Sequence, residues 1–249
     1  DAPGMPARTA TLRLIATGDL HGRLLSFDYA ADRPDDGPSL AALAPLIRQL
    51  RAEAPCLLVD LGDALQGNAL TLHAAQDGAR GPHPMIAAMN ALGHDAATLG
   101  NHDFDFALPA LDRALAAARF PVVVSNLSLD GGAGPGPALR RTILRRALGR
   151  GASVAVGLIG LVPPQTLGWN RAHLPGARID GIAAAARAQA AALRREGAEI
   201  VVALCHSGAG APTAGPDAEH AARAVAAEPG IDAVLAGHSH EALAEDGAA

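Results

Sequence analysis

Five short apolar runs in this sequence each end in a cluster of polar side chains. In order along the chain they read IATGDLHGR, LLVDLGDALQGN, ATLGNHDFD, VALCHSG and VLAGHSH. Continuously apolar runs of this length are typical of strands that are buried on both faces of a sheet. In open α/β sheets the carboxyl ends of the strands line the ligand crevice. We therefore expect the five polar clusters to meet at one edge of the fold.

The remaining sequence alternates between strand-like and helix-like segments. Apolar runs predict seven strands, at 11–17, 56–62, 96–100, 121–127, 153–162, 200–205 and 231–237. Segments rich in Ala, Leu and Arg with helical periodicity lie between them, at 39–53, 83–92, 107–119, 181–197 and 217–228. Two irregular loops, 130–138 and 163–177, interrupt the pattern, and residues 139–148 alternate enough to form an exposed strand. The alternation predicts an α/β fold, and we expect residues 1–249 to form one domain.

Composition excludes several classes of function. The chain has 249 residues, a formal net charge of -5 and no lysine, so an electrostatic surface for a nucleic-acid polymer is not expected. No apolar run reaches the roughly 18 residues of a membrane span, so we expect no membrane partner. Aromatic residues make up only 2%, which leaves few rings to stack on a nucleobase. Cys56 and Cys205 lie in apolar runs and are expected to be buried thiols.

The polar clusters contain groups that bind divalent metals. Asp19 and His21 are two residues apart, so on an extended segment both side chains would point the same way and could share one ion. His238 and His240 repeat this spacing. Seven such groups exceed what one ion needs and suit two ions that share a carboxylate, which we expect to be Asp63. The seven candidate metal ligands are Asp19, His21, Asp63, Asn101, His206, His238 and His240.

This donor set also limits the metal and the chemistry. Carboxylate, imidazole and amide oxygen together suit Mn, Fe, Zn, Co or Mg rather than a thiolate zinc site. Two metals roughly 3.5–4 Å apart form the usual clamp for in-line displacement at a phosphate. The sequence therefore predicts two divalent metal ions as cofactors and a phosphoester as substrate.

The motifs GDLHGR, GDALQGN, GNHDFD, CHSG and GHSH, in this order, resemble those of the calcineurin-like metallophosphoesterases, in particular the 5′-nucleotidase family. The stretches HPMIAAMNALGHDAATLGNHDF and GLIGLVPPQTLGWNRAHLPG are similar to those of the periplasmic 2′,3′-cyclic-nucleotide 2′-phosphodiesterase/3′-nucleotidases. The resemblance runs from about Leu12 to His240. It implies a metallophosphatase-type αββα sandwich with a dinuclear metal site at the carboxyl edge of its strands.

The resemblance also divides the ligands and implies a catalytic pair. One metal site would take Asp19, His21, Asp63 and His240, and the other Asp63, Asn101, His206 and His238. His102 matches a histidine that faces the phosphate without binding a metal, and Asp105 matches its orienting partner. We therefore expect His102 and Asp105 to be catalytic, and Asn101 and His102 to contact substrate. Position 103 is usually Glu in this family, and we assign Asp103 no catalytic role.

The expected reaction is hydrolysis of 2′,3′-cyclic nucleotides to 3′-nucleotides, and of 3′-nucleotides to nucleosides and phosphate. A 5′-nucleotidase or UDP-sugar hydrolase is the main alternative, because GNHDFD fits that branch at least as well. A thiosulfate-handling hydrolase of the same superfamily is a third alternative. A non-catalytic fragment that binds metal or nucleotide is a fourth, although the retention of all expected ligands argues against it.

Relatives in this family normally carry a second, C-terminal domain that supplies aromatic rings and arginines to the nucleotide. The sequence ends nine residues after His240 and is poor in aromatic residues. We therefore expect a catalytic domain that is incomplete at its C-terminus and lacks that nucleotide-binding domain. The expected partner is a small-molecule nucleotide, and we expect a monomer. The resemblance implies a periplasmic or secreted location. The start at Asp1 fits a mature secreted protein or a chain that has been shortened.

Other polar residues have plainer expected roles. Asp60 precedes Asp63 by three residues and should support the site from outside the ligand set. Trp169 anchors its loop or forms part of the substrate mouth, and we favour the anchor. Five histidines without a partner motif are expected on the surface or at helix caps: His73, His83, His94, His173 and His220.

Overall fold

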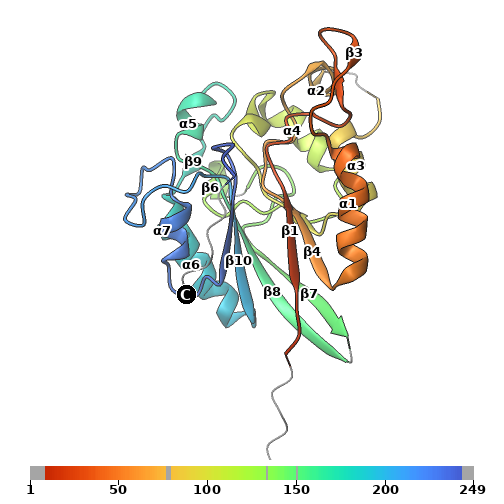
Figure 1. Cartoon of the computed structure of the whole chain (residues 1–249). Coiled ribbons are helices and arrows are strands. Elements are labelled where there is room, and N and C mark those ends of the chain that lie inside the picture. The colour runs from red at the N-terminus through yellow and green to blue at the C-terminus, as the bar shows by residue number, and fades with distance from the viewer. Residues whose placement is uncertain (1–8, 77–79, 133, 150, 243–249) are drawn as a thin grey trace, which may run out of the picture.

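The computed structural model describes residues 9–76, 80–132, 134–149 and 151–242. Two sheets face each other in the middle of the molecule, and helices cover the outer side of each (Figure 1). The first sheet has the parallel order β1-β4-β5, formed by Arg13–Thr17, Cys56–Asp60 and Ala96–Ala97. The second has the order β11-β10-β8-β7, formed by Ala233–Ala236, Ile200–Cys205, Ala152–Leu161 and Thr142–Gly149. This αββα arrangement confirms the expected fold class.

Helices pack on the outer side of each sheet. The first sheet carries α1 (Leu40–Glu53), α3 (Pro84–Leu92) and α4 (Ala107–Leu115), with α2 (Ala69–Ala75) against the last two. The second sheet carries α6 (Ile182–Arg195) and α7 (Ala222–Ala226). The smaller elements are β2 (Phe27–Asp28), β3 (Arg33–Pro34), β6 (Leu127–Ser128), β9 (Arg178–Ile179), α5 (Thr166–Trp169) and the 3₁₀ turns η1 (His102–Phe104) and η2 (Asp130–Gly132).

Local signals set the helix ends. α1 begins after Ser39, whose hydroxyl accepts a hydrogen bond from the Ala42 amide. α3 begins at Pro84 after His83, whose ring accepts from the Met85 amide, so the predicted capping role of His83 is confirmed. α3 ends at Gly93, where φ is 74°, a left-handed conformation that glycine adopts without steric cost.

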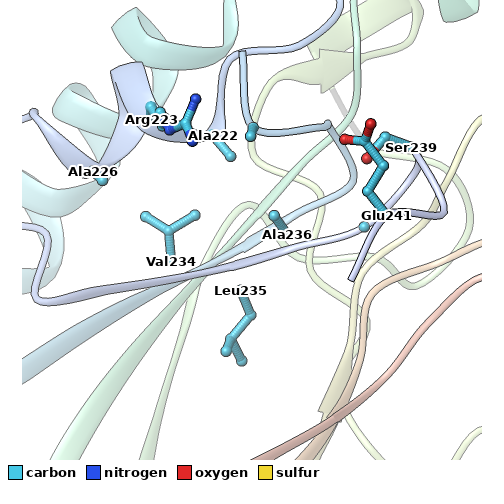
Figure 2. A pocket seen from close by; sticks show the side chains of 10 residues that line it. Ala222, Arg223, Ala226, Val234, Leu235, Ala236, Ser239 and Glu241 are labelled. Carbon is cyan, nitrogen blue, oxygen red and sulfur yellow. The ribbon is translucent and has the colours of Figure 1, made fainter. Parts of the chain in front are cut away.

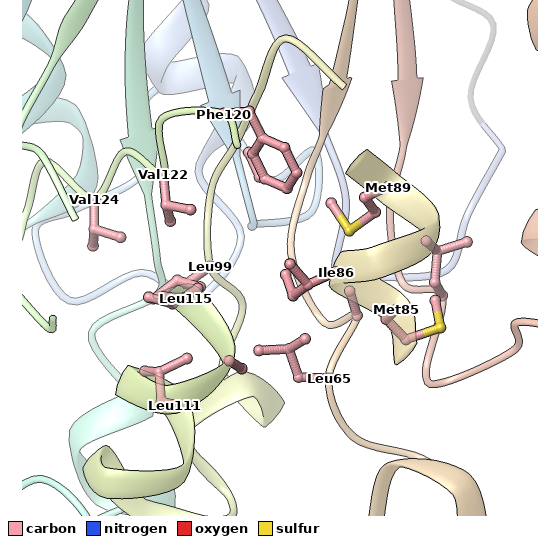
Figure 3. Close-up of a cluster of buried hydrophobic side chains, with 14 of the residues drawn as sticks. Leu65, Met85, Ile86, Met89, Leu99, Leu111, Leu115, Phe120, Val122 and Val124 are labelled. Atoms are coloured by element: carbon pink, nitrogen blue, oxygen red, sulfur yellow. The ribbon is translucent and has the colours of Figure 1, made fainter. Parts of the chain in front are cut away.

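Three apolar clusters hold the layers together. Between the sheets, side chains from β4, β8 and β10 interdigitate: Leu57, Val59, Val156, Leu158, Val202 and Leu204. The outer cluster of the first sheet is shown in Figure 3, where Met89 of α3 lies near Phe120. The third cluster lies between α6, α7 and the second sheet. Both cysteines are buried free thiols, as predicted, and burial raises the pKa of Cys205 to about 12.

The segment 121–127, predicted as a strand, pairs regularly only at its last residue, where β6 begins. Val122 forms an isolated bridge to Ala97 of the first sheet, whereas the Ser125 amide donates to the Gly160 carbonyl of the second. Because the segment crosses from one sheet to the other, it cannot extend either ladder. Gly160 permits the crossing, since a Cβ there would clash with the Val123 carbonyl oxygen.

Two other predictions need correction. The helix predicted at 217–228 is only Ala222–Ala226, because residues 207–221 are held in turns. The loop predicted at 163–177 contains the short helix α5. Among the described residues, no helix is both long enough and apolar enough to cross a bilayer.

Candidate metal centre

The five polar clusters meet beyond the carboxyl ends of five parallel strands. β1 ends at Thr17, β4 at Asp60, β5 at Ala97, β10 at Cys205 and β11 at Ala236. In each case the strand register places these last residues beside one another within their sheet. The loops that follow carry the candidate ligands of both sheets to one edge of the sandwich (Figure 1).

The first group contains candidate ligands that are far apart in the sequence. Asp19, His21 and His240 present ligand atoms that lie within 4.8 Å of one another. His240 Nε2 is 3.4 Å from Asp19 Oδ1 and 3.4 Å from His21 Nε2. Two imidazole nitrogens and a carboxylate oxygen at these separations can converge on one cation.

The second group is more deeply buried. Asp63, His206 and His238 also present ligand atoms within 4.8 Å of one another. Asn101 joins them, because its Oδ1 atom is 3.2 Å from His206 Nε2. His206 is held from behind by a 2.8 Å contact between its Nδ1 atom and the Leu61 carbonyl, which leaves Nε2 directed at the group.

Asp63 lies between the two groups. Its Oδ2 atom is 3.1 Å from His206 Nε2 and 3.9 Å from His21 Nε2. Its Oδ1 atom accepts a 2.8 Å hydrogen bond from the His102 amide. The Asp63 carboxylate therefore lies within 3.9 Å of a ring nitrogen from each group.

Most of the candidate ligands have an unusual backbone conformation. A positive φ outside glycine is uncommon and persists where the surrounding structure enforces it. Among the described residues, seven non-glycine positions have a positive φ, and five of them are candidate ligands: Asp19 (50°), His21 (44°), Asp63 (56°), His238 (77°) and His240 (54°). The strain is thus concentrated at this site.

The extended geometry predicted for the two closely spaced pairs is wrong. β1 ends before Asp19, and left-handed turns rather than a strand direct Asp19 and His21 into the first group. His238 and His240 do not share a group, because His238 lies with Asp63 and His240 with Asp19. A spacing of two residues did bring Asp19 and His21 together, but through turns.

The buried Asp63 carboxylate lies 3.1 Å from His206 Nε2, where it stabilises a proton on His206. Burial raises the pKa of Asp63, but the hydrogen bond and charge of His206 outweigh burial and hold it below its usual value. Burial lowers the pKa of His206, yet its contact with Asp63 and the charges of Asp63 and Asp19 raise it to about 9. A divalent cation bound between these side chains would take the place of that proton, so its affinity would rise with pH.

His102 and Asp105 form a hydrogen-bonded pair at the edge of the site. His102 Nδ1 is 2.8 Å from Asp105 Oδ2, and the His102 ring packs edge-on against His21 with centroids 5.4 Å apart. Burial lowers the pKa of His102, but the hydrogen bond to Asp105 and the charges of Asp63 and Asp105 outweigh it and raise that pKa. With Nδ1 held by Asp105, Nε2 is the nitrogen available to a substrate.

Asp103 has a structural role that the sequence did not reveal. Its buried carboxylate accepts four backbone hydrogen bonds, from Asp63 (2.9 Å), Ala64 (3.0 Å), Leu65 (2.9 Å) and Gly100 (2.8 Å). It therefore ties the turn after β4 to the turn after β5. A carboxylate that accepts hydrogen bonds from backbone amides has no partner motif in the sequence. The sequence therefore indicated no role for Asp103.

Gly100 is needed for space rather than for backbone freedom. A Cβ at this position would clash with Asp63 Oδ1 and would lie 2.5 Å from His206 Cε1. Its φ is not in the left-handed region, so backbone conformation does not require a glycine here. Any side chain here would push apart two members of the second group.

Asp60 lies at the end of β4, outside both groups of candidate ligands, as its position in the sequence predicted. It is buried and accepts hydrogen bonds from the Thr17 hydroxyl (2.6 Å) and the Gly62 amide (3.0 Å). Burial is the main cause that raises the pKa of Asp60 to about 7. The Thr17 hydroxyl also lies 3.1 Å from His94 Nε2, so His94 is a buried partner here and not a surface residue.

The segment 163–177 borders the site from the second sheet. Asn170 Nδ2 donates a buried 2.9 Å hydrogen bond to the Asn101 carbonyl, and His173 Nδ1 is 3.1 Å from the Phe104 carbonyl. These residues, rather than Trp169, anchor the loop. Trp169 is 49% exposed, and its ring lies 5.8 Å from that of His238. His220 is exposed, as predicted, and its ring lies 5.7 Å from that of His238.

A hollow of about 370 Å³ lies next to the site, between α7 and β11 (Figure 2). Val234, Leu235 and Arg223 line it, together with Ser239 and Glu241 from the following segment. None of the seven candidate ligands lines this hollow. It is therefore separate from the candidate metal centre.

The donor set fits divalent cations. It consists of carboxylate oxygens, imidazole nitrogens and one amide oxygen, the ligands that Mn, Zn, Fe and Co accept. Within each group the donor atoms lie within 4.8 Å of one another. The buried Asp63 carboxylate lies near a ring nitrogen of both groups. The proton held by Asp63 and His206 is the kind that a cation displaces on binding.

Comparison with known proteins agrees with this geometry. The family model for calcineurin-like phosphoesterases matches residues 12–242. A 2′,3′-cyclic-nucleotide 2′-phosphodiesterase/3′-nucleotidase from Haemophilus influenzae is 37% identical over 236 residues, covering 92% of this chain and 36% of the relative. The trifunctional nucleotide phosphoesterase protein YfkN of Bacillus subtilis is 36% identical, with 92% of this chain and 16% of the relative covered.

A solved structure shows the same fold. The crystal structure of the calcineurin-like phosphoesterase YfkN from Bacillus subtilis superposes with a TM-score of 0.84 at 35% identity, covering 92% of this chain and 72% of that one. This chain spans less than two fifths of the length of the two curated relatives above.

Proposed function

The chain belongs to the calcineurin-like phosphoesterase family, and we propose that it hydrolyses nucleotide phosphoesters with two divalent cations. The proposed reactions convert a 2′,3′-cyclic nucleotide to a 3′-nucleotide, and a 3′-nucleotide to a nucleoside and phosphate. The observation that supports the proposal best is the Asp63 carboxylate shared by two groups of donors. The relatives named as cyclic-nucleotide phosphodiesterases and nucleotidases supply the substrate class.

Each cation would have its own ligands. Asp19, His21, Asp63 and His240 would hold one, and Asp63, Asn101, His206 and His238 would hold the other. When bound, such a pair would polarise the phosphate and lower the pKa of a water molecule, and Asp63 would belong to both sets of ligands. Mn, Zn, Fe, Co and Mg are all compatible with these oxygen and nitrogen donors.

His102 and Asp105 would handle the proton of the leaving group. In the proposed reaction a water molecule would add to phosphorus and lose one proton to solvent, and the bond from phosphorus to the 2′ oxygen would break. Protonated His102 would give the proton on Nε2 to that oxygen. Asp105 keeps the ring oriented through its 2.8 Å contact with Nδ1 and favours the protonated form. In the second reaction the bond to the 3′ oxygen breaks in the same way. Asn101 and His102 would contact the substrate phosphate.

We further infer that the chain acts as a monomeric catalytic domain on a small-molecule nucleotide in the periplasm or outside the cell. The family resemblance supports this location. Cell fractionation of the source organism and the sedimentation velocity of the purified chain test these two points. Recovery in the cytosol, or a stable dimer, would contradict them.

The proposed reaction is tested by an activity panel of 2′,3′-cyclic AMP, 3′-AMP and 5′-AMP on the Mn²⁺-loaded chain. We expect turnover of the first two substrates. Cleavage of 5′-AMP alone would favour a 5′-nucleotidase, the alternative that GNHDFD fits. Two bound equivalents of metal without turnover of any substrate, bis-p-nitrophenyl phosphate included, would contradict an enzymatic function.

The catalytic pair is tested by His102→Ala. We expect the variant to keep both cations, because His102 belongs to neither donor group. Its kcat should fall by about 10²–10⁴-fold, the usual contribution of a general acid. His73→Ala, an exposed histidine on α2, is the matched control and should change neither quantity. A collapse of metal content in His102→Ala would show that His102 is a ligand.

A further inference from the structure

The Glu219 side chain contacts one of the candidate ligands. Glu219 Oε1 is 2.8 Å from His238 Nε2, a hydrogen-bond distance between a carboxylate and an imidazole. Neither the apolar runs nor the motifs of the sequence single out Glu219. A histidine that uses Nε2–H toward a carboxylate has its lone pair on Nδ1, and it is this nitrogen that can bind a cation.

Glu219 is held in place by the segment that carries another ligand. The Ser207 hydroxyl donates a 2.6 Å hydrogen bond to the Glu219 carbonyl and accepts one of 2.9 Å from the Ala221 amide. Ser207 is fully buried and directly follows His206. The backbone of Glu219 is thus tied to the end of β10, beside the second donor group.

Packing fixes the plane of the His238 ring. It does not decide whether Nε2 or Nδ1 faces Glu219. The ring lies between those of His206, His220 and Trp169, with centroids 5.1, 5.7 and 5.8 Å away. A half-turn of an imidazole about its Cβ–Cγ bond occupies nearly the same space, so these neighbours resist tilting far more than a flip. A directional hydrogen bond from one nitrogen to Glu219 distinguishes the two orientations.

We propose that Glu219 is a positioning residue of the second cation site, which fixes the orientation and tautomer of His238 so that Nδ1 is offered to the metal. The inference rests on the proposed function only in taking His238 as a ligand. Carboxylates that hold a metal-binding histidine in this way typically contribute 10- to 100-fold in metal affinity. Glu219 itself would not touch the cation or the substrate.

The test measures metal binding without substrate, by calorimetric titration with Mn²⁺ and by quenching of tryptophan fluorescence with Co²⁺. Trp169 is the only tryptophan in the chain, so its signal reports the ion beside His238. Glu219→Ala should weaken one of two ions by about 10- to 100-fold. Glu219→Gln, which keeps an oxygen that can accept from Nε2–H, should retain an intermediate affinity.

Glu196→Ala is the matched control, because Glu196 is similarly exposed and pairs with Arg141 at the end of α6. It should leave both affinities unchanged. Unchanged affinity in Glu219→Ala would overturn the proposal. The proposal would also be overturned if the parent chain bound three equivalents of Mn²⁺ and Glu219→Ala lost only the third. Glu219 would then be a metal ligand beside His220. Binding of two ions without nucleotide turnover would contradict the proposed function but not this role of Glu219.

Discussion

Among single residues, Asp103 has a structural role although it lies inside a motif of catalytic and metal-binding residues. Both carboxylate oxygens are used by backbone amides, and those amides come from the turns that carry Asp63 and Asn101. Burial is the main cause that raises the pKa of Asp103 to about 6, with the charge of Asp63 adding to it and the amides opposing it. The residue therefore sets the distance between two candidate ligands without being one.

Asp103→Asn should unfold more easily and bind metal more weakly. An amide group offers one acceptor oxygen, so about two of the four backbone N–H groups would face an NH₂ group instead. Each buried donor left without an acceptor costs about 1–3 kcal/mol, so the free energy of unfolding should fall by several kcal/mol. Urea unfolding and Mn²⁺ titration measure the two effects, with Asp217→Asn on the exposed 215–218 turn as a control. An unchanged unfolding midpoint would show that the Asp103 carboxylate does not hold the two turns together.

At the scale of elements, apolar runs predicted the strands well where both faces are buried. β4, β8 and β10 lie inside their predicted ranges or within one residue of them. The segment 121–127 has an equally apolar sequence, but its hydrogen bonds are divided between two sheets, which no local pattern encodes. α2 was missed because it is one short helix defined by the Asn68–Thr71 capping box rather than by apolar periodicity.

The short helix α5 should control the geometry of the site. Asn170, which follows α5, donates its side-chain N–H to the Asn101 carbonyl across a buried 2.9 Å contact. Asn170→Ala should therefore leave the overall fold intact but cost about 1–3 kcal/mol of stability. Because Asn101 would lose its support, we also expect lower affinity for one cation and a lower kcat.

Its control is Arg171→Ala, an exposed neighbour on the same segment. Circular dichroism, urea unfolding and metal titration of the two variants separate a loss of support at Asn101 from a general loosening of the loop. Equal effects of the two substitutions would mean that α5 acts through its packing and not through this hydrogen bond.

At the scale of the whole molecule, the sequence predicted that five strand ends would meet, and the two-sheet sandwich brings them together. It did not predict the left-handed turns at Asp19, His21, Asp63, His238 and His240. A positive φ is uncommon outside glycine, even for aspartate and histidine, which adopt it more often than most residues. It also did not predict Glu219, whose contact with His238 depends on how residues 207–221 fold back onto β10.

Bound cations should stabilise the whole sandwich against unfolding. The candidate ligands follow strands of both sheets, so bound cations would join the sheets only in the folded chain. A ligand that binds only the native state at 100 times its Kd stabilises by about 2.7 kcal/mol. For a chain of this size that corresponds to a rise in Tm of about 5–10 °C, which scanning calorimetry with and without Mn²⁺ can measure.

Asp63→Asn should remove most of that rise, because the loss of one shared carboxylate weakens both ions together. The amide keeps the volume of the side chain but not its charge, so the comparison isolates the electrostatic contribution to metal binding. Glu53→Gln, which breaks the exposed ion pair with Arg13, should keep the full rise. A full rise in Asp63→Asn would exclude Asp63 as a ligand. Loss of only one of the two ions would leave it a ligand but not the shared one, and the two sheets would then be joined through separate sites.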